Sequence, residues 1–163
     1  MDPPATGGSR LTSPRLCFVC LGNICRSPAA AAVLTDLAAD AGVEVAIDSA
    51  GTSCHHLGEE PHEHTRAEAR RRGITVEHRA REFRAADFDR FDVVVVMDRA
   101  NRREVLRLAP DDAARAKVRL LCVAGDEVEV PDPWGLPSSA YVEMFDLLDV
   151  ACRELLAELG DTP

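Results

Sequence analysis

Hydrophobic residues recur along the chain in two patterns, short continuous runs and longer stretches at helical spacing. The runs predict four strands, at residues 16–19, 45–47, 92–97 and 119–123. The longer stretches predict five helices, at residues 28–41, 63–72, 83–91, 99–108 and 138–159. Ser27 and Pro28 are expected to be the N-cap and first residue of the first helix. Because strands alternate with helices, we predict an α/β fold with a four-stranded parallel sheet covered on both faces.

Length and composition indicate where the domain begins and ends and in which compartment the protein works. A chain of 163 residues fits one domain, which we place at residues 15–160, after a Pro-, Gly-, Ser- and Thr-rich segment, residues 1–14, that we predict to be a disordered tail. The sequence shows no export signal and no membrane span, so we expect a cytoplasmic protein with its six cysteines reduced. A net charge of -9 argues against nucleic-acid binding. We expect a monomer that binds neither nucleic acid nor membrane.

Candidate chemistry lies between the first predicted strand and the first predicted helix, where residues 20–27 read Cys-Leu-Gly-Asn-Ile-Cys-Arg-Ser. Ligands of parallel sheets bind beyond the carboxyl ends of the strands. Such a loop can turn successive N–H groups inward toward an anion, and the helix N-terminus adds partial positive charge there. Arg26 offers a planar fork that matches two phosphate oxygens. We predict that the phosphate is bound, besides Arg26, by Leu21, Gly22, Asn23, Ile24, Cys25 and Ser27.

Cys20 is the candidate nucleophile of this loop. The positive charge that would hold a phosphate also favours the thiolate, the form that attacks phosphorus, and Ser27 can hydrogen-bond to it. Departure of an alkoxide or phenoxide needs an acid, and Asp132, in a loop near the end of the last strand, is the candidate. Cysteine followed by arginine six positions later also arises by chance around inert thiols. The preceding strand and the following helix start favour the functional interpretation.

Four stretches, residues 19–28, 48–52, 96–98 with Asn101, and 131–133, resemble the low-molecular-weight protein-tyrosine phosphatase family over nearly the whole predicted domain. The resemblance implies a flavodoxin-like three-layer sandwich, catalytic Cys20, Arg26 and Asp132, a phosphocysteine intermediate, and no cofactor or metal. It also implies that Asn23, Ser49 and His78 belong to a hydrogen-bond network that fixes the loop. Cys25 would be able to form a protective disulfide with Cys20, which would make the enzyme redox-sensitive.

The predicted substrate cleft departs from the family pattern at both walls. Trp134 and Gly135 stand where many members have two tyrosines, and His55 stands where Trp or Tyr is common. Trp134 can stack on a substrate ring or be a core residue. The nearby histidines, His55, His56, His62 and His64, are interpreted as a polar surface loop and helix start rather than a metal site, because no familiar ligand spacing is complete.

These features predict a protein-tyrosine phosphatase that acts on phosphotyrosine in proteins or peptides. A protein-arginine phosphatase is the alternative, since such proteins resemble this chain at Trp134-Gly135, although they typically carry threonine where Ile24 stands. A thiol-dependent arsenate reductase would need two further neighbouring cysteines, and residues 55–121 contain none. A phosphopeptide-binding module would require loss of a catalytic group, and all three are present.

Overall fold

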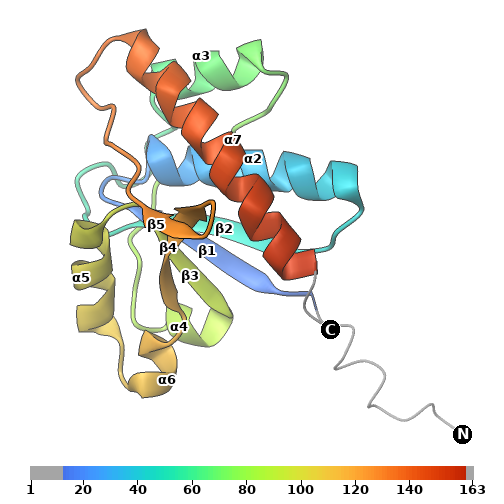
Figure 1. Ribbon diagram of the computed structural model, residues 1–163. Coiled ribbons are helices and arrows are strands. Elements are labelled where there is room, and N and C mark those ends of the chain that lie inside the picture. The colour runs from blue at the N-terminus through green and yellow to red at the C-terminus, as the bar shows by residue number, and fades with distance from the viewer. Residues whose placement is uncertain (1–12, 161–163) are drawn as a thin grey trace, which may run out of the picture.

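The computed structural model describes residues 13–160, so residues 1–12 of the predicted tail lie outside the described part of the chain. A five-stranded sheet with the order β2-β1-β3-β4-β5 forms its middle layer (Figure 1). Neighbouring strands among the first four pair in parallel, which confirms the predicted parallel sheet. The strands are β1 (Arg15–Cys20), β2 (Ala46–Gly51), β3 (Val93–Val96), β4 (Val118–Val123) and β5 (Asp126–Val128).

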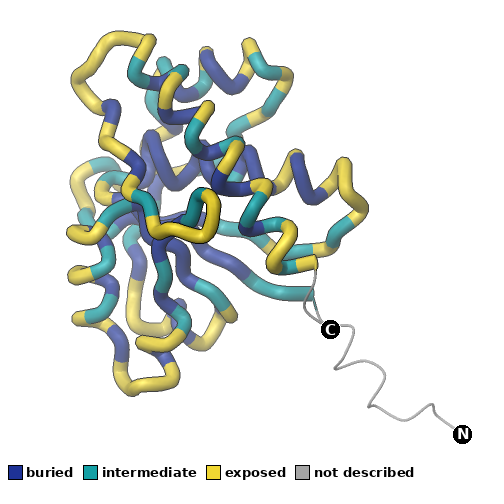
Figure 2. Tube along the Cα trace, viewed as in Figure 1, coloured by how far each residue is buried: buried dark blue, intermediate teal, exposed yellow. Residues whose placement is uncertain are grey.

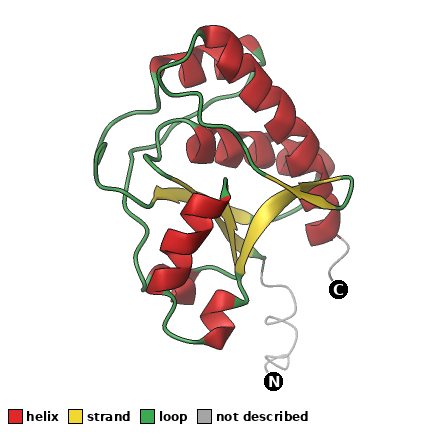
Figure 3. Cartoon of the chain, turned by 60° about the vertical axis from the view of Figure 1, so that its left-hand side comes forward, coloured by secondary structure: helices red, strands yellow, loops and turns green. Residues whose placement is uncertain are grey.

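Helices cover both faces of the sheet, as the alternation of elements predicted. On one face lie α2 (Arg26–Ala41), α3 (Glu63–Arg71) and α7 (Ser138–Gly160). On the other lie α4 (Asp87–Arg90), α5 (Arg99–Leu108) and α6 (Asp112–Arg115), and the turned view in Figure 3 shows the sheet edge between the two helical layers. The three-layer, flavodoxin-like sandwich is thus confirmed. Within residues 13–160, no helix combines the length and apolar character needed to cross a membrane.

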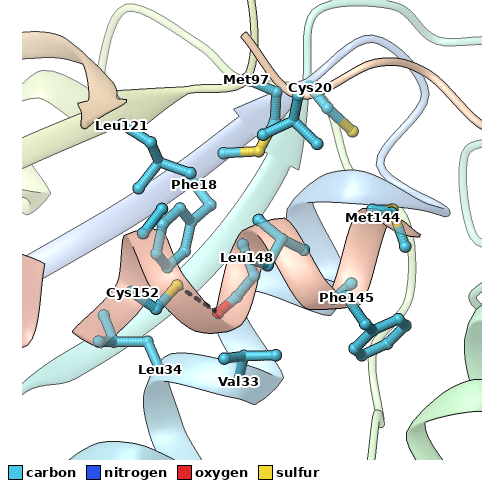
Figure 4. Close-up of a cluster of buried hydrophobic side chains, with 14 of the residues drawn as sticks. Phe18, Cys20, Val33, Leu34, Met97, Leu121, Met144, Phe145, Leu148 and Cys152 are labelled. Atoms are coloured by element: carbon cyan, nitrogen blue, oxygen red, sulfur yellow. Dashed lines mark hydrogen bonds between the residues drawn. The ribbon is translucent and has the colours of Figure 1, made fainter. Parts of the chain in front are cut away.

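The sequence of β1 is a continuous apolar run because both faces of the strand are buried. Leu16 and Phe18 pack into the cluster between the sheet and the helices α2 and α7, where Figure 4 shows Phe18 close to Leu148 and Leu121. The alternate residues, Cys17 and Val19, belong to the second cluster under α4 and α5. A strand buried on both faces has no polar side, and Figure 2 shows β1 as buried over most of its length.

The antiparallel edge strand β5 was not predicted. It follows β4 through a two-residue turn at Ala124 and Gly125, both with positive φ (54° and 85°), and pairs Val123 with Asp126. Two successive residues with positive φ are the geometry of a tight hairpin turn whose twist matches the strands. Because the new strand is short and mostly exposed, its residues carry no run of apolar side chains that would reveal it.

Three predicted element boundaries were wrong. The first helix begins at Arg26 with Cys25 as its N-cap, not at Pro28 with Ser27 as cap. In the predicted helix 83–91, only Asp87–Arg90 is helical, because the phenylalanines of this segment, among them Phe83, are spaced to fill the core under the sheet rather than one helix face. The second strand was predicted to end at Ile47, but it runs from Ala46 to Gly51 because it pairs with β1 over this whole length.

Candidate active site

The predicted phosphate loop connects the last residue of β1, Cys20, to the first residue of α2, Arg26, at the carboxyl edge of the sheet. A pocket opens over this loop, and two other loops, one after β2 and one before α7, complete its walls. The residues that line it are Cys20, Leu21, Gly22, Ile24, Cys25, Arg26, Ser53, His55, His56, Asp132 and Trp134. The fold therefore brings the predicted nucleophile, arginine, acid and both cleft residues to one place.

The Cys20 sulfur lies among hydrogen-bonding groups. The Asn23 backbone N–H donates to Sγ at 3.2 Å, and the Ser27 hydroxyl lies 3.0 Å from it. Asn23 adopts a left-handed conformation with φ of 58°, which turns its N–H back toward the sulfur and which asparagine tolerates better than most residues. Both groups lie where they can hydrogen-bond to a ligand-facing sulfur atom at the base of the pocket.

The side chain of Asn23 holds the loop in this shape. Its amide nitrogen donates to Ser27 Oγ at 2.7 Å and to Ser49 Oγ at 3.0 Å. Its amide oxygen lies 2.7 Å from His78 Nε2 and accepts from the Arg81 backbone N–H at 3.0 Å. Because that oxygen can only accept, Nε2 of the imidazole carries a proton, and burial lowers the pKa of His78. The structure thus joins the predicted supporting residues in one network.

Two glycines allow close approach around the loop. A Cβ atom on Gly51 would lie 2.8 Å from the Leu21 carbonyl oxygen and 3.1 Å from the Asn23 Cβ. A Cβ atom on Gly22 would lie 2.9 Å from His56 Cδ2. The β2 end and the following loop therefore pack directly on the phosphate loop. A side chain at Gly51 would meet the backbone of that loop and push the two apart, whereas a side chain at Gly22 would displace the His56 ring. Sequence reasoning placed Gly51 in a motif without assigning it this role.

Arg26 is 3% exposed, and acceptors fix its guanidinium on two sides. Nη1 donates to Asp98 Oδ2 at 2.6 Å and to the Val130 carbonyl oxygen at 3.0 Å, while Nη2 lies 3.7 Å from Asp132 Oδ2. Asp98 also caps α5, since its Oδ1 accepts from the Asn101 N–H at 2.7 Å. Sequence reasoning missed Asp98 as an orienting residue; the available signal was an aspartate just after a buried strand and three residues before asparagine.

The predicted acid, Asp132, stands at the side of the pocket with 42% of its side chain exposed. Its Oδ1 accepts from the Trp134 N–H at 3.1 Å, which leaves Oδ2 toward Arg26. Trp134 is 59% exposed, so the interpretation as a core residue is wrong and the ring is free to meet a ligand. His55 is also exposed and lines the same pocket, consistent in position with the predicted cleft wall.

The second loop cysteine and the histidines lie beside the pocket. Cys25 Sγ is 3.6 Å from the Tyr141 hydroxyl, and burial raises the pKa of the Cys25 thiol to about 11, so this thiol is protonated at neutral pH. His62 and His64 pack against the Tyr141 ring, with centroids 5.2 and 5.1 Å away. Among residues 13–160, no group of three or more His, Cys, Asp or Glu side chains could hold a metal ion.

Comparison with known proteins gives consistent matches over the whole described domain. The model of the family described as low molecular weight phosphotyrosine protein phosphatase matches residues 15–162. A low molecular weight protein-tyrosine-phosphatase from Streptomyces coelicolor is 42% identical over 154 residues, which cover 90% of this chain and 94% of that protein.

Solved structures show the same fold. A protein tyrosine phosphatase from Entamoeba histolytica superposes with a TM-score of 0.86 and 34% identity, covering 91% of this chain and 98% of that one. The arginine phosphatase YwlE, with a phosphorylated active-site serine, superposes with a TM-score of 0.82 and 26% identity, covering 90% of this chain and 96% of that one. The chain therefore belongs to the low molecular weight phosphotyrosine protein phosphatase family, as its motifs implied.

Proposed function

We propose that this hydrolase removes phosphate from phosphotyrosine in proteins or peptides through a phosphocysteine intermediate on Cys20. One observation carries the proposal: the Cys20 sulfur, the Arg26 guanidinium and the Asp132 carboxylate line one pocket at the carboxyl edge of the sheet. The names of the relatives in the family, which are tyrosine phosphatases, support the substrate class.

In the first step, the loop N–H groups and the Arg26 fork bind the non-bridging phosphate oxygens. The Cys20 thiolate attacks phosphorus on the side opposite the tyrosine oxygen, so that an S–P bond forms as the P–O bond breaks. Protonated Asp132 donates its proton to the departing phenol oxygen. This role is supported by the position of the carboxyl group, which is partly exposed in the pocket lining and has its Oδ2 3.7 Å from Nη2 of Arg26, the proposed phosphate ligand.

In the second step, the Asp132 carboxylate takes a proton from a water molecule as the water oxygen attacks phosphorus. The S–P bond breaks, its electron pair returns to sulfur, and inorganic phosphate leaves. Asn23 N–H and the Ser27 hydroxyl, both within 3.2 Å of the Cys20 sulfur, stabilise the thiolate that is released. Arg26 is held by Asp98 throughout, so it needs no rearrangement between the steps.

The wall of the pocket supports an aromatic substrate. Trp134 presents an exposed ring, His55 stands on the neighbouring loop, and the apolar side chain of Ile24 lines the same space. Phosphoarginine is the second candidate, because the chain is similar in structure to an arginine phosphatase and carries Trp134-Gly135. Ile24 argues against it, since the side chain at this position has no hydroxyl to hydrogen-bond a guanidinium group.

Steady-state kinetics with phosphotyrosine, phosphoarginine and phosphoserine versions of one peptide test the proposal. We expect the highest kcat/KM for phosphotyrosine, no turnover by Cys20→Ser, and a kcat reduced about 10²–10⁴-fold by Asp132→Ala. Normal turnover by Cys20→Ser would refute the nucleophile, and a higher kcat/KM for phosphoarginine would assign the second candidate function.

We further propose that the enzyme works as a cytoplasmic monomer and that oxidation reversibly joins Cys20 to Cys25. All six cysteines are unpaired in the structure, which suits a reducing compartment. The disulfide proposal is supported by the place of both thiols in one pocket lining. Peroxide inactivation that dithiothreitol reverses in the wild type, but not in Cys25→Ser, tests it.

A further inference from the structure

Large apolar side chains on the surface of the described residues gather around the candidate active site. Six such side chains are exposed, and four of them, Leu21, Leu57, Trp134 and Leu136, belong to the loops that surround the pocket. Their exposed fractions run from 45 to 59%. Scattered single apolar residues are normal on a protein surface, but a group of them beside one site marks a binding surface. We call these four residues the apolar rim.

The loops that carry the apolar rim are connected to each other by hydrogen bonds. The Leu21 carbonyl oxygen accepts from both the backbone N–H and the hydroxyl of Ser53, at 3.0 Å each, so the phosphate loop and the loop that carries Leu57 lie together. Leu57 is further held in a turn, closed by the Glu59 N–H donating to the His56 carbonyl oxygen at 2.9 Å. These contacts hold the rim in place around the pocket.

Leu136 is held on the other side of the pocket. Its N–H donates to the Pro133 carbonyl oxygen at 2.9 Å, which closes a turn around Trp134, a residue that lines the pocket itself. This turn belongs to the exposed connection between β5 and α7, which Figure 2 shows in yellow along most of its path. The apolar rim is therefore continuous with the pocket that receives the phosphate and the aromatic ring.

Charged groups lie next to the rim but not on it. A groove that shares Ile24, His56 and Trp134 with the pocket is also lined by three carboxylates and two arginines, namely Glu59, Glu60, Glu63, Arg66 and Arg79. Glu60 pairs with Arg66 at 3.5 Å and with Arg79 at 3.4 Å, while Glu59 lies 3.0 Å from His56 Nδ1. Ion pairs within the groove and the surrounding salt weaken its field at the rim. The four rim side chains themselves are apolar, so burial of apolar surface is their contribution to binding.

We infer that the apolar rim binds the polypeptide on either side of the phosphotyrosine, and that the enzyme prefers substrates with aliphatic residues next to it. The inference rests on the proposed function, because the phosphotyrosine in the pocket is what brings the flanking residues to the rim. About half of each rim side chain is exposed, so a bound peptide can bury apolar surface there. Burial of apolar surface strengthens peptide binding and so lowers KM. The partner is thus a phosphorylated segment rich in Leu, Ile or Val rather than one flanked by charges.

The test compares peptides that carry leucine, aspartate or lysine on both sides of one phosphotyrosine. We expect the leucine peptide to have a kcat/KM about fivefold to tenfold above the other two, mainly through KM. The double variant Leu57→Ser, Leu136→Ser is expected to remove this preference. Leu108→Ser is the matched control, because Leu108 is 40% exposed on α5 and lines no part of the pocket.

Hydrolysis of p-nitrophenyl phosphate, which has no flanking residues, reports the chemistry separately from the rim. Equal kcat/KM for the three peptides, or a preference that survives in the double variant, would overturn the inference while leaving the proposed function intact. A dimer in gel filtration that the double variant dissociates would also overturn it, since the rim would then be covered by a second copy. Wild-type protein inactive on p-nitrophenyl phosphate as well as on peptides would instead refute the proposed function.

Discussion

The ion pair that orients Arg26 is open to a quantitative test with Asp98→Asn. Asparagine keeps an oxygen that can accept from the Asn101 N–H and so cap α5, but its amide group replaces the carboxylate oxygen 2.6 Å from Arg26 Nη1. The substitution removes the charge and places a donor against a donor. Since Arg26 is 3% exposed, its charge cannot be rehydrated without moving the loop.

The cost follows from these contacts. Removing one partner of a buried ion pair costs about 3–5 kcal/mol, and because the Asp98 side chain is 22% exposed we expect the lower end, about 3 kcal/mol. For a domain of this size that corresponds to a Tm lower by about 6–12 °C. A misplaced guanidinium should also lower kcat/KM for an aryl phosphate by about 10²-fold.

Thermal melts and initial-rate kinetics measure both effects, with Asp112→Asn as the control. That residue makes an ion pair of the same length, 2.6 Å, with Arg115, but its side chain is 98% exposed. We expect the control to match the wild type, because water and salt screen exposed pairs. Wild-type Tm and kcat/KM in Asp98→Asn, or an equal loss in both variants, would refute the argument that burial makes this pair important.

Three further changes test other contacts. Arg81→Met leaves the buried carboxylate of Asp87 without one of its cations. Urea unfolding should show a free energy of unfolding lower by about 2 kcal/mol, and Arg81→Lys should restore part of it. Equal losses in both variants would contradict this. Gly51→Ala should cost about 1–3 kcal/mol and most of the activity, because its methyl group meets the phosphate loop, whereas Gly160→Ala, with nothing within 4 Å, should cost little. His62 caps α3 through Nδ1, and burial lowers the pKa of its imidazole. The imidazole therefore takes up a proton more readily in the unfolded chain than in the folded one. The free energy of unfolding should fall as the pH drops below 6.5. A pH profile of Tm that His62→Asn leaves unchanged would exclude this cause.

The local order of the site could be predicted from sequence because its parts are neighbours in the chain. A buried strand, a loop with Cys20 and Arg26, and a helix start follow one another within about a dozen residues, and strand and helix patterns are local properties. The strong apolar runs gave β1, β3 and β4 nearly at their observed positions. The segment 83–91 misled the prediction because its phenylalanines serve the core between layers, which a one-dimensional pattern does not distinguish from a helix face.

The role of Ser27 shows a second limit. A serine before a proline favours a helix cap, and the sequence supports that interpretation as strongly as any other. The sequence also offered the Cys20 sulfur as a partner for this hydroxyl. In the structure the hydroxyl lies 3.0 Å from that sulfur and accepts from Asn23, while the helix begins at Arg26, two residues before the predicted start. Only the curled path of the loop shows which partner the hydroxyl reaches.

The sequence by itself determined the loop that joins Cys20 to Arg26, the parallel α/β fold and the family, because each depends on residue types at short spacing. The tertiary structure alone decided which distant residues complete the site. Pairing of β1 with β2 sets Cys20 beside Gly51, and pairing with β3 sets Val19 beside Val96, so that Asp98 arrives next to Arg26. Strand order and register depend on how whole faces pack against the helices, and no local pattern contains that information.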